Sequence, residues 1–285
     1  MARVHNRCSR LILCAGWALA MIGLGCSGKY EIAAADQLAP AGQQAQAVAR
    51  IRHQEFWLLH RSVKEMPLRF YVDDQPQRAA ITDRKGYAAA NVPVPAEPGV
   101  YPMVIAYQDL FGQEAWTQVP THVWPADAQV TMVDLDGLKL ADASGQVAGL
   151  SALAQSSKLI YLSTDSPRDY AQWHVKLESV GAPDGPIVPW NKGKPAQVAA
   201  QLESLRGIYP NARTGVGDVK SAALFEQAGL QAQTLDWLAQ QAPPATQPPQ
   251  QAEPASDSQA PAEPPPADQA LPPADAPAVE PATQP

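Results

Sequence analysis

Two aspartates that lie one residue apart follow a short apolar run, residues 130–133, and precede Gly137. In an extended segment, residues i and i+2 point the same way, so Asp134 and Asp136 can present both carboxylates on one side. The run before them is β-branched and apolar, which is typical of a buried strand. In open α/β sheets, ligands bind at the carboxyl ends of the strands. The pair is therefore a candidate site for acid chemistry.

Other polar groups follow two later predicted strands, an apolar one over residues 158–162 and a weak one over residues 212–216. Ser163 ends the run 158–162, Asp218 follows the run 212–217, and a lysine pair, Lys192 and Lys194, lies between them. Because the carboxyl ends of parallel strands meet at one edge, we expect these groups to converge. One carboxylate could attack phosphorus while a second protonates the leaving oxygen. Acids on different strands could hold Mg²⁺, and a hydroxyl and an ammonium could stabilise phosphoryl charge.

The order of these motifs resembles the haloacid dehalogenase (HAD) superfamily. That family has D-x-D-G after its first strand, then a strand ending in Ser or Thr, then a lysine, then G-D. The matching residues here are Asp134-Leu135-Asp136-Gly137, Ser163, Lys194 or Lys192, and Gly217-Asp218.

The resemblance implies a role for each matched residue. Asp134 would be the nucleophile and an Mg²⁺ ligand, and Asp136 would be the general acid and base, with its backbone carbonyl on the metal. Ser163 and Lys194 would hold the phosphoryl group, and Asp218 would complete the metal site. These roles imply a phosphatase that works through an aspartyl-phosphate intermediate.

Within that superfamily, the residues from Ile160 to Ile187 resemble the lipin and actin-patch groups of phosphatidate phosphatases. The short run from 137 to 154 leaves no room for a large cap domain, and a capless site suits a bulky or membrane-borne ester. Two features depart from the family: Leu138 stands where Thr or Val is usual, and Ala222 and Ala223 stand where a second acid is expected. They support an alternative, a degenerate module that binds a phospholipid or an envelope partner without turnover.

The elements that position these residues predict an α/β chain. Strands and helices alternate over residues 129–240, which indicates a parallel sheet covered by helices and, by the resemblance, a HAD-like domain. Residues 46–128 show short alternating runs separated by turn signals, which predict a small β-sandwich that resembles transthyretin-like or immunoglobulin-like modules. We expect its tryptophans, Trp57, Trp116 and Trp124, to pack in the core or between domains.

The N-terminal residues predict a secretion signal. Arg3, Arg7 and Arg10 precede an apolar stretch, residues 11–24, that is shorter than a typical membrane-spanning helix. The stretch ends in Gly23-Leu24-Gly25-Cys26, which resembles a bacterial lipobox, with Gly23 in place of the usual branched aliphatic residue. The resemblance implies that residues 1–25 are a signal peptide and that Cys26 becomes lipidated. We therefore expect a lipid-anchored protein of the bacterial cell envelope, whose residues 26–45 form a linker.

Composition limits the remaining possibilities. The 285 residues suggest one or two domains, and the formal net charge of -7 shows no nucleic-acid footprint. All three cysteines, Cys8, Cys14 and Cys26, are N-terminal, so no later disulfide or cysteine metal site can form. Residues 241–285 are rich in Pro, Ala and Gln, and we expect a disordered tail. We expect a membrane lipid and a phosphorylated small molecule or phospholipid as partners; the oligomeric state is left open.

Overall fold

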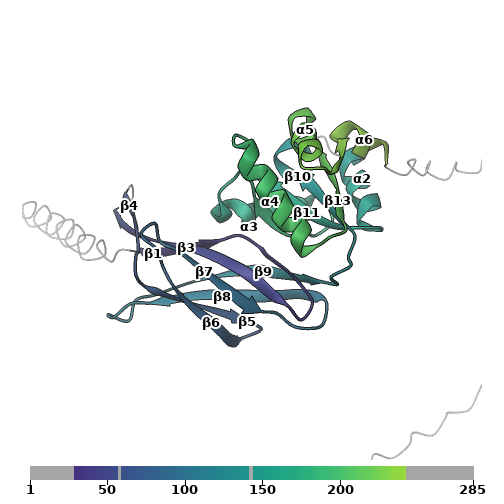
Figure 1. Ribbon diagram of the computed structural model, residues 1–285. Coiled ribbons are helices and arrows are strands. Elements are labelled where there is room, and N and C mark those ends of the chain that lie inside the picture. The colour runs from purple at the N-terminus through teal and green to yellow at the C-terminus, as the bar shows by residue number, and fades with distance from the viewer. Residues whose placement is uncertain (1–28, 57–58, 141–143, 242–285) are drawn as a thin grey trace, which may run out of the picture. The chain divides into compact units, whose positions relative to one another are not determined.

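The structure, a computed structural model, describes residues 29–56, 59–140 and 144–241 (Figure 1). Backbone contacts divide the chain into two units, Met1–Ala245 and Thr246–Pro285. The predicted signal peptide, the lipidation site Cys26 and residues 242–285 of the predicted tail lie outside the described residues. Within those residues, no helix combines the length and apolar character needed to cross a membrane.

The first half of the described chain forms two sheets. One is antiparallel and contains β1, β3, β4 and β7; the other is mixed, in the order β2-β9-β8-β5-β6, with β2 parallel to β9. Both sheets contribute to one hydrophobic core, which includes Ile51, Phe70 and Ile105. The strands are β1 (Lys29–Ala34), β2 (Gln37–Pro40), β3 (Gln44–Phe56), β4 (Leu59–Ser62), β5 (Pro67–Val72), β6 (Gln75–Ile81), β7 (Tyr87–Pro93), β8 (Gly99–Gln108) and β9 (Glu114–Trp124).

The second half contains a five-stranded sheet whose pairings are all parallel, in the order β12-β11-β10-β13-β14. Its central strand is β10, and the chain moves to one side of β10 for β11 and β12 and to the other side for β13 and β14. Such a reversal of strand order opens a crevice at the carboxyl ends of the strands. The strands are β10 (Val130–Asp134), β11 (Lys158–Ser163), β12 (Ile187–Pro189), β13 (Ala212–Gly217) and β14 (Gln231–Thr234).

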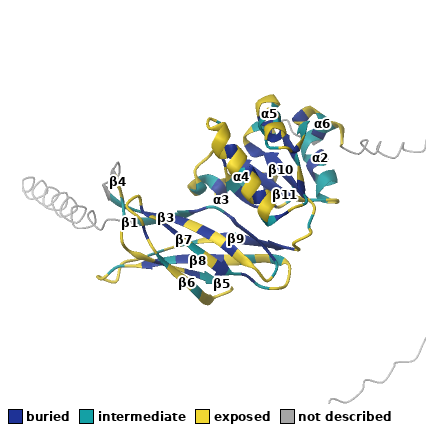
Figure 2. Ribbon diagram, in the orientation of Figure 1, coloured by how far each residue is buried: buried dark blue, intermediate teal, exposed yellow. Residues whose placement is uncertain are grey.

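Helices cover both faces of this sheet, so β10 is buried along its whole length (Figure 2). Neighbouring residues of a strand face opposite sides. Met132 accordingly joins a core with residues of α4 and α5, whereas Val133 joins another with residues of α2, α3 and α6. The helices are α2 (Ser144–Ala154), α3 (Tyr170–Ser179), α4 (Pro195–Ile208), α5 (Val219–Gln227) and α6 (Leu235–Gln240), with short 3₁₀ turns η1 (Leu135–Gly137) and η3 (Pro167–Asp169).

The predicted fold class is wrong. In the described residues, β1 to β9 build antiparallel and mixed sheets, and the parallel sheet is confined to β10–β14. The chain is thus β-rich, and the expected α/β architecture with a HAD-like domain is not its fold class. The sequence prediction weighted the alternating second half too strongly. It also treated the β-strands of the first half as a small β-sandwich that does not determine the fold class.

Two finer predictions also need correction. Residues 26–45 do not form the expected linker throughout, because β1 and β2 lie there and β2 is buried along its whole length. This stretch is rich in Ala, whose small side chain gives a weak strand signal but packs well between close sheets. Trp124 is buried as expected, whereas Trp116 is 70% exposed. Trp57 lies outside the described residues.

Candidate functional site

Asp134 ends the central strand β10 and is fully buried. The Oγ of Ser221 donates a hydrogen bond to its Oδ2 at 2.6 Å. The Nζ of Lys192 donates to the same oxygen at 2.7 Å and lies 2.6 Å from Oδ1. Oδ1 itself has no hydrogen bond from the described residues. The carboxylate therefore has one oxygen held by two donors and one held only by the charge of the ammonium.

Lys192 is the lysine that reaches the site. Its Nζ contacts Asp134 and also lies 3.5 Å from Asp136 Oδ2 and 5.1 Å from the centre of the Trp190 ring. The sequence analysis left Lys194 and Lys192 open and gave the role to Lys194; the structure places Lys192, and not Lys194, beside Asp134 and Asp136. Lys194 is exposed at the N-cap of α4, where its backbone carbonyl accepts the first hydrogen bonds of the helix. Pro195 begins α4, which fixes Lys194 as the cap residue.

Asp136 lies in the turn η1 and is held by the end of the neighbouring strand β11. Ser163 Oγ donates to Asp136 Oδ1 at 2.8 Å, and the backbone N–H of Thr164 lies 3.0 and 3.2 Å from its two oxygens. The Asp136 side chain is 21% exposed, whereas Ser163 is fully buried. The predicted convergence of these two residues is therefore present. Asp136 is the more accessible of the two carboxylates in the D-x-D motif.

Asp218 follows β13 and caps α5. Its Oδ1 accepts a hydrogen bond from the backbone N–H of Ser221 at 2.7 Å. Burial acts to raise the pKa of Asp218, but the hydrogen bonds from Ser221 and the nearby Lys192 outweigh it, so the pKa is lowered. Ser221 thus bonds Asp134 through its hydroxyl and Asp218 through its backbone. The sequence reasoning missed Ser221, although its position three residues after a capping aspartate was a usable signal.

Two glycines allow the strand ends to approach each other. A Cβ at Gly217 would lie 2.6 Å from the Cβ of Ser221 and 3.0 Å from that of Asp134. A Cβ at Gly137 would lie 3.0 Å from Asp134 Oδ2. Side chains at these positions would push against the carboxylate. The glycines of D-x-D-G and G-D are therefore required by packing around Asp134.

The Mg²⁺ site predicted at Asp134, Asp136 and Asp218 stays a prediction. In the part of the chain that the structure describes, no group of three or more His, Cys, Asp or Glu side chains could hold a metal ion. Asp134 and Asp218 nevertheless both bond Ser221, so two carboxylates from adjacent strand ends lie around one residue. Mg²⁺ commonly binds through one or two carboxylates, with waters and substrate phosphate completing its shell. The donor set around Ser221 fits that mode.

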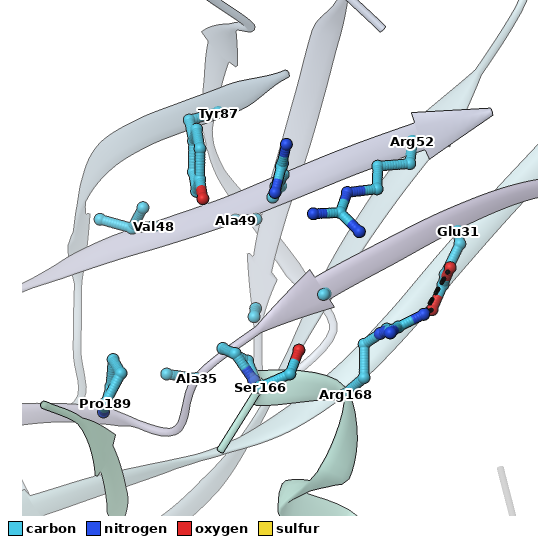
Figure 3. A pocket seen from close by; sticks show the side chains of 13 residues that line it. Glu31, Ala35, Val48, Ala49, Arg52, Tyr87, Ser166, Arg168 and Pro189 are labelled. Atoms are coloured by element: carbon cyan, nitrogen blue, oxygen red, sulfur yellow. Dashed lines mark hydrogen bonds and ion pairs between the residues drawn. The ribbon is translucent and has the colours of Figure 1, made fainter. Parts of the chain in front are cut away.

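A cavity of about 290 Å³ lies beside the loop that follows Ser163 (Figure 3). Ser166 lines it, and the three residues from Ser163 to Ser166 span at most about 11 Å. Arg52 and Arg168 supply positive charge to its wall, and Arg168 pairs with Glu31 at 3.3 Å. The rest of the wall is mainly apolar, with Ala33, Ala34, Ala35, Val48, Ala49 and Pro189 among its residues.

Comparison with known proteins identifies no family for this chain. No family model matches the sequence, and no curated protein does. Among solved structures, one similar chain is described as a beta-galactosidase from Bacteroides fragilis, with 10% sequence identity and a TM-score of 0.26. The match covers 71% of this chain, which spans only 38% of the length of that one.

Proposed function

We propose that this chain is a lipid-anchored phosphatase of the bacterial cell envelope that hydrolyses phosphate monoesters, phosphatidate among them, through an aspartyl-phosphate intermediate. The observation that carries the proposal is the convergence of Asp134, Asp136 and Lys192 at the carboxyl end of β10. The order of the motifs, which resembles that of the haloacid dehalogenase superfamily, supports the same chemistry. The anchor is the proposed lipidation of Cys26.

In the first step, Asp134 Oδ1 forms a bond to phosphorus and the bond from phosphorus to the ester oxygen breaks. Asp136 gives its proton to the departing oxygen. In the second step, Asp136 takes a proton from water, the water oxygen bonds to phosphorus, and the bond between phosphorus and Asp134 Oδ1 breaks, which restores the carboxylate and releases inorganic phosphate. Lys192 compensates charge on the phosphoryl oxygens as they enter the site. Mg²⁺, held by Asp134 and Asp218, would supply further positive charge at the same place.

The cavity beside Ser166 suits the part of the ester that is not transferred. Its wall is mainly apolar, with arginine at the edge. A leaving group with an apolar body and an anionic or polar head would match that wall. This supports a lipid-like ester over a small sugar phosphate.

The test is hydrolysis of a generic phosphate ester and of phosphatidate by the full chain, with Mg²⁺ and with the metal chelated. We expect Mg²⁺-dependent phosphate release by the parent chain and loss of release by Asp134→Asn. The tryptic peptide that contains Asp134 should carry a phosphoryl group after rapid acid quenching. If the parent hydrolyses neither ester, the enzyme proposal fails. If Asp134→Asn retains full activity, the assignment of the nucleophile fails.

One observation favours a second function. Asp134 is fully buried and already paired with Lys192, as in a structural ion pair. A module that binds a phospholipid headgroup without turnover would keep this pair and need no displacement of the lysine. Binding of phosphatidate by both the parent and Asp134→Asn, without phosphate release by either, identifies that function.

A further inference from the structure

The turn between β8 and β9 presents two large apolar side chains to solvent. Leu110 is 96% exposed and Phe111 is 90% exposed. The turn is held in one shape, because Asp109 Oδ1 accepts hydrogen bonds from the backbone N–H groups of Phe111 and Gln113, each at 2.8 Å. Single exposed apolar residues are common on soluble proteins. Here two neighbours occupy the end of a fixed hairpin, which we call the Leu110–Phe111 tip.

An exposed tryptophan lies on the same hairpin. Trp116 of β9 is 70% exposed and pairs with Ala106 of β8, a few residues from the turn. Tryptophan is enriched where a protein meets the headgroup layer of a membrane, because its ring is apolar and its N–H is polar. The hairpin thus has apolar side chains at its end and an amphipathic ring farther along.

The tip lies beside the start of the described chain. Tyr30, in β1, donates a hydrogen bond through its hydroxyl to Asp109 Oδ2 at 3.3 Å, and its ring centre lies 4.8 Å from that of Tyr107. Tyr30 follows Cys26 by four residues, a length of chain that spans at most about 14 Å. A lipid attached at Cys26 must therefore enter a membrane close to the tip.

We propose that the Leu110–Phe111 tip inserts into the lipid bilayer that holds the acyl chains of Cys26. The inference rests on the lipid anchor proposed above and is independent of phosphatase activity. The partner is the boundary between headgroups and acyl chains, where amphipathic elements bury an apolar face. Asp109 and Glu114 flank the tip, so the contact is apolar and does not need anionic lipid. It fixes the orientation of the β-sheets at the membrane surface.

The experiment places a fluorescent probe at the tip. The full chain with Leu110→Cys is labelled with an environment-sensitive thiol dye and reconstituted into phosphatidylcholine vesicles that contain a nitroxide on the acyl chains. The control is Gln75→Cys. Gln75 is exposed and follows the turn between β5 and β6. This turn lies at the other end of the sheet from the tip, because Val72, the last residue of β5, pairs with Met103, five residues before the end of β8. Both variants carry the same native cysteines, and the labelled parent chain gives the blank.

We expect a blue-shifted emission and strong quenching at position 110, and neither at position 75. Equal signals at the two positions overturn the proposal. Mass spectrometry of the same samples reports on the anchor separately. If the chain is acylated and floats with the vesicles but the probe at position 110 is not quenched, insertion of the tip is refuted and the lipid anchor at Cys26 is supported. If the chain carries no acyl groups, the lipid anchor is refuted. Insertion of the tip is then refuted as well, unless vesicles added to that chain quench the probe at position 110.

Discussion

The substitution Lys192→Met tests whether the ion pair at the end of β10 is a stabilising feature of the site. It removes the ammonium that lies 2.6 and 2.7 Å from the two oxygens of Asp134 and keeps the apolar stem of the side chain. Asp134 is fully buried, so its carboxylate would keep only the hydrogen bond from Ser221. The variant therefore leaves a buried charge without a counterion.

Removal of one partner from a buried pair costs about 3–5 kcal/mol. Lys192 is 22% exposed, so water can reach the vacated place, and we expect about 3 kcal/mol, at the low end of that range. For a unit of this size that loss lowers the Tm by roughly 6–12 °C. Thermal and urea unfolding at pH 7, followed by far-ultraviolet circular dichroism, measures both quantities.

Lys194→Met is the matched control, because Lys194 is two residues away and exposed. It should change the free energy of unfolding by about 0.5 kcal/mol or less. Adding Asp134→Asn to Lys192→Met should restore part of the lost stability, because the double variant has no unpaired charge. An unchanged Tm in Lys192→Met, or an equal loss in Lys194→Met, would refute the role given to the ion pair.

Two further predictions concern His174 and Gly217. The pKa of His174 is raised above its ordinary 6.5, chiefly by the hydrogen bond to Asp36, with burial opposing. The stability that His174 adds relative to His174→Gln should thus be complete below about pH 6.5 and should be lost as the pH rises through the folded-state pKa. Urea unfolding of both proteins from pH 5 to 9 measures this difference in stability. A difference that stays constant with pH would contradict the prediction. Gly217→Ala should cost about 1–3 kcal/mol because its Cβ meets Ser221 and Asp134. Gly207→Ala, where a Cβ in α4 meets nothing within 4 Å, should be neutral or stabilising; equal losses in the two would refute the packing argument.

The parallel strands were predictable because their sequence signal is local. The run before Asp134 is mostly apolar and β11 is apolar after Lys158, so the amino-acid sequence by itself places their polar ends at one edge. The strand β13 has a weaker pattern, and its prediction depended on the Gly217-Asp218 pair that follows Val216. The strands β1 and β2 were not predictable in this way. Both strands mix polar residues with alanine and contain no long apolar run, and their burial depends on pairing with other strands, β3 and β9.

The same distinction separates the site residues that were found from those that were missed. Asp134, Asp136 and Ser163 lie at or just after strand ends, so topology alone brings them together. The choice between Lys192 and Lys194 depends on the turn before α4, where a shift of two residues decides which side chain reaches Asp134. Ser221 was missed because it lies inside a helix rather than at a strand end.

Charge at the site decides what a phosphate ester needs in order to bind there. The carboxylates of Asp134 and Asp218 face one ammonium from Lys192, which leaves a formal charge of −1 when Asp136 carries the proton that it donates and −2 when it does not. A phosphate monoester brings further negative charge into a buried place, where repulsion is poorly screened. Binding therefore requires an added cation, and the two carboxylates around Ser221 are the groups that can hold it. An ester that binds equally well with Mg²⁺ and with the metal chelated must contact the protein elsewhere, and the arginine-edged cavity beside Ser166 is then the place to look.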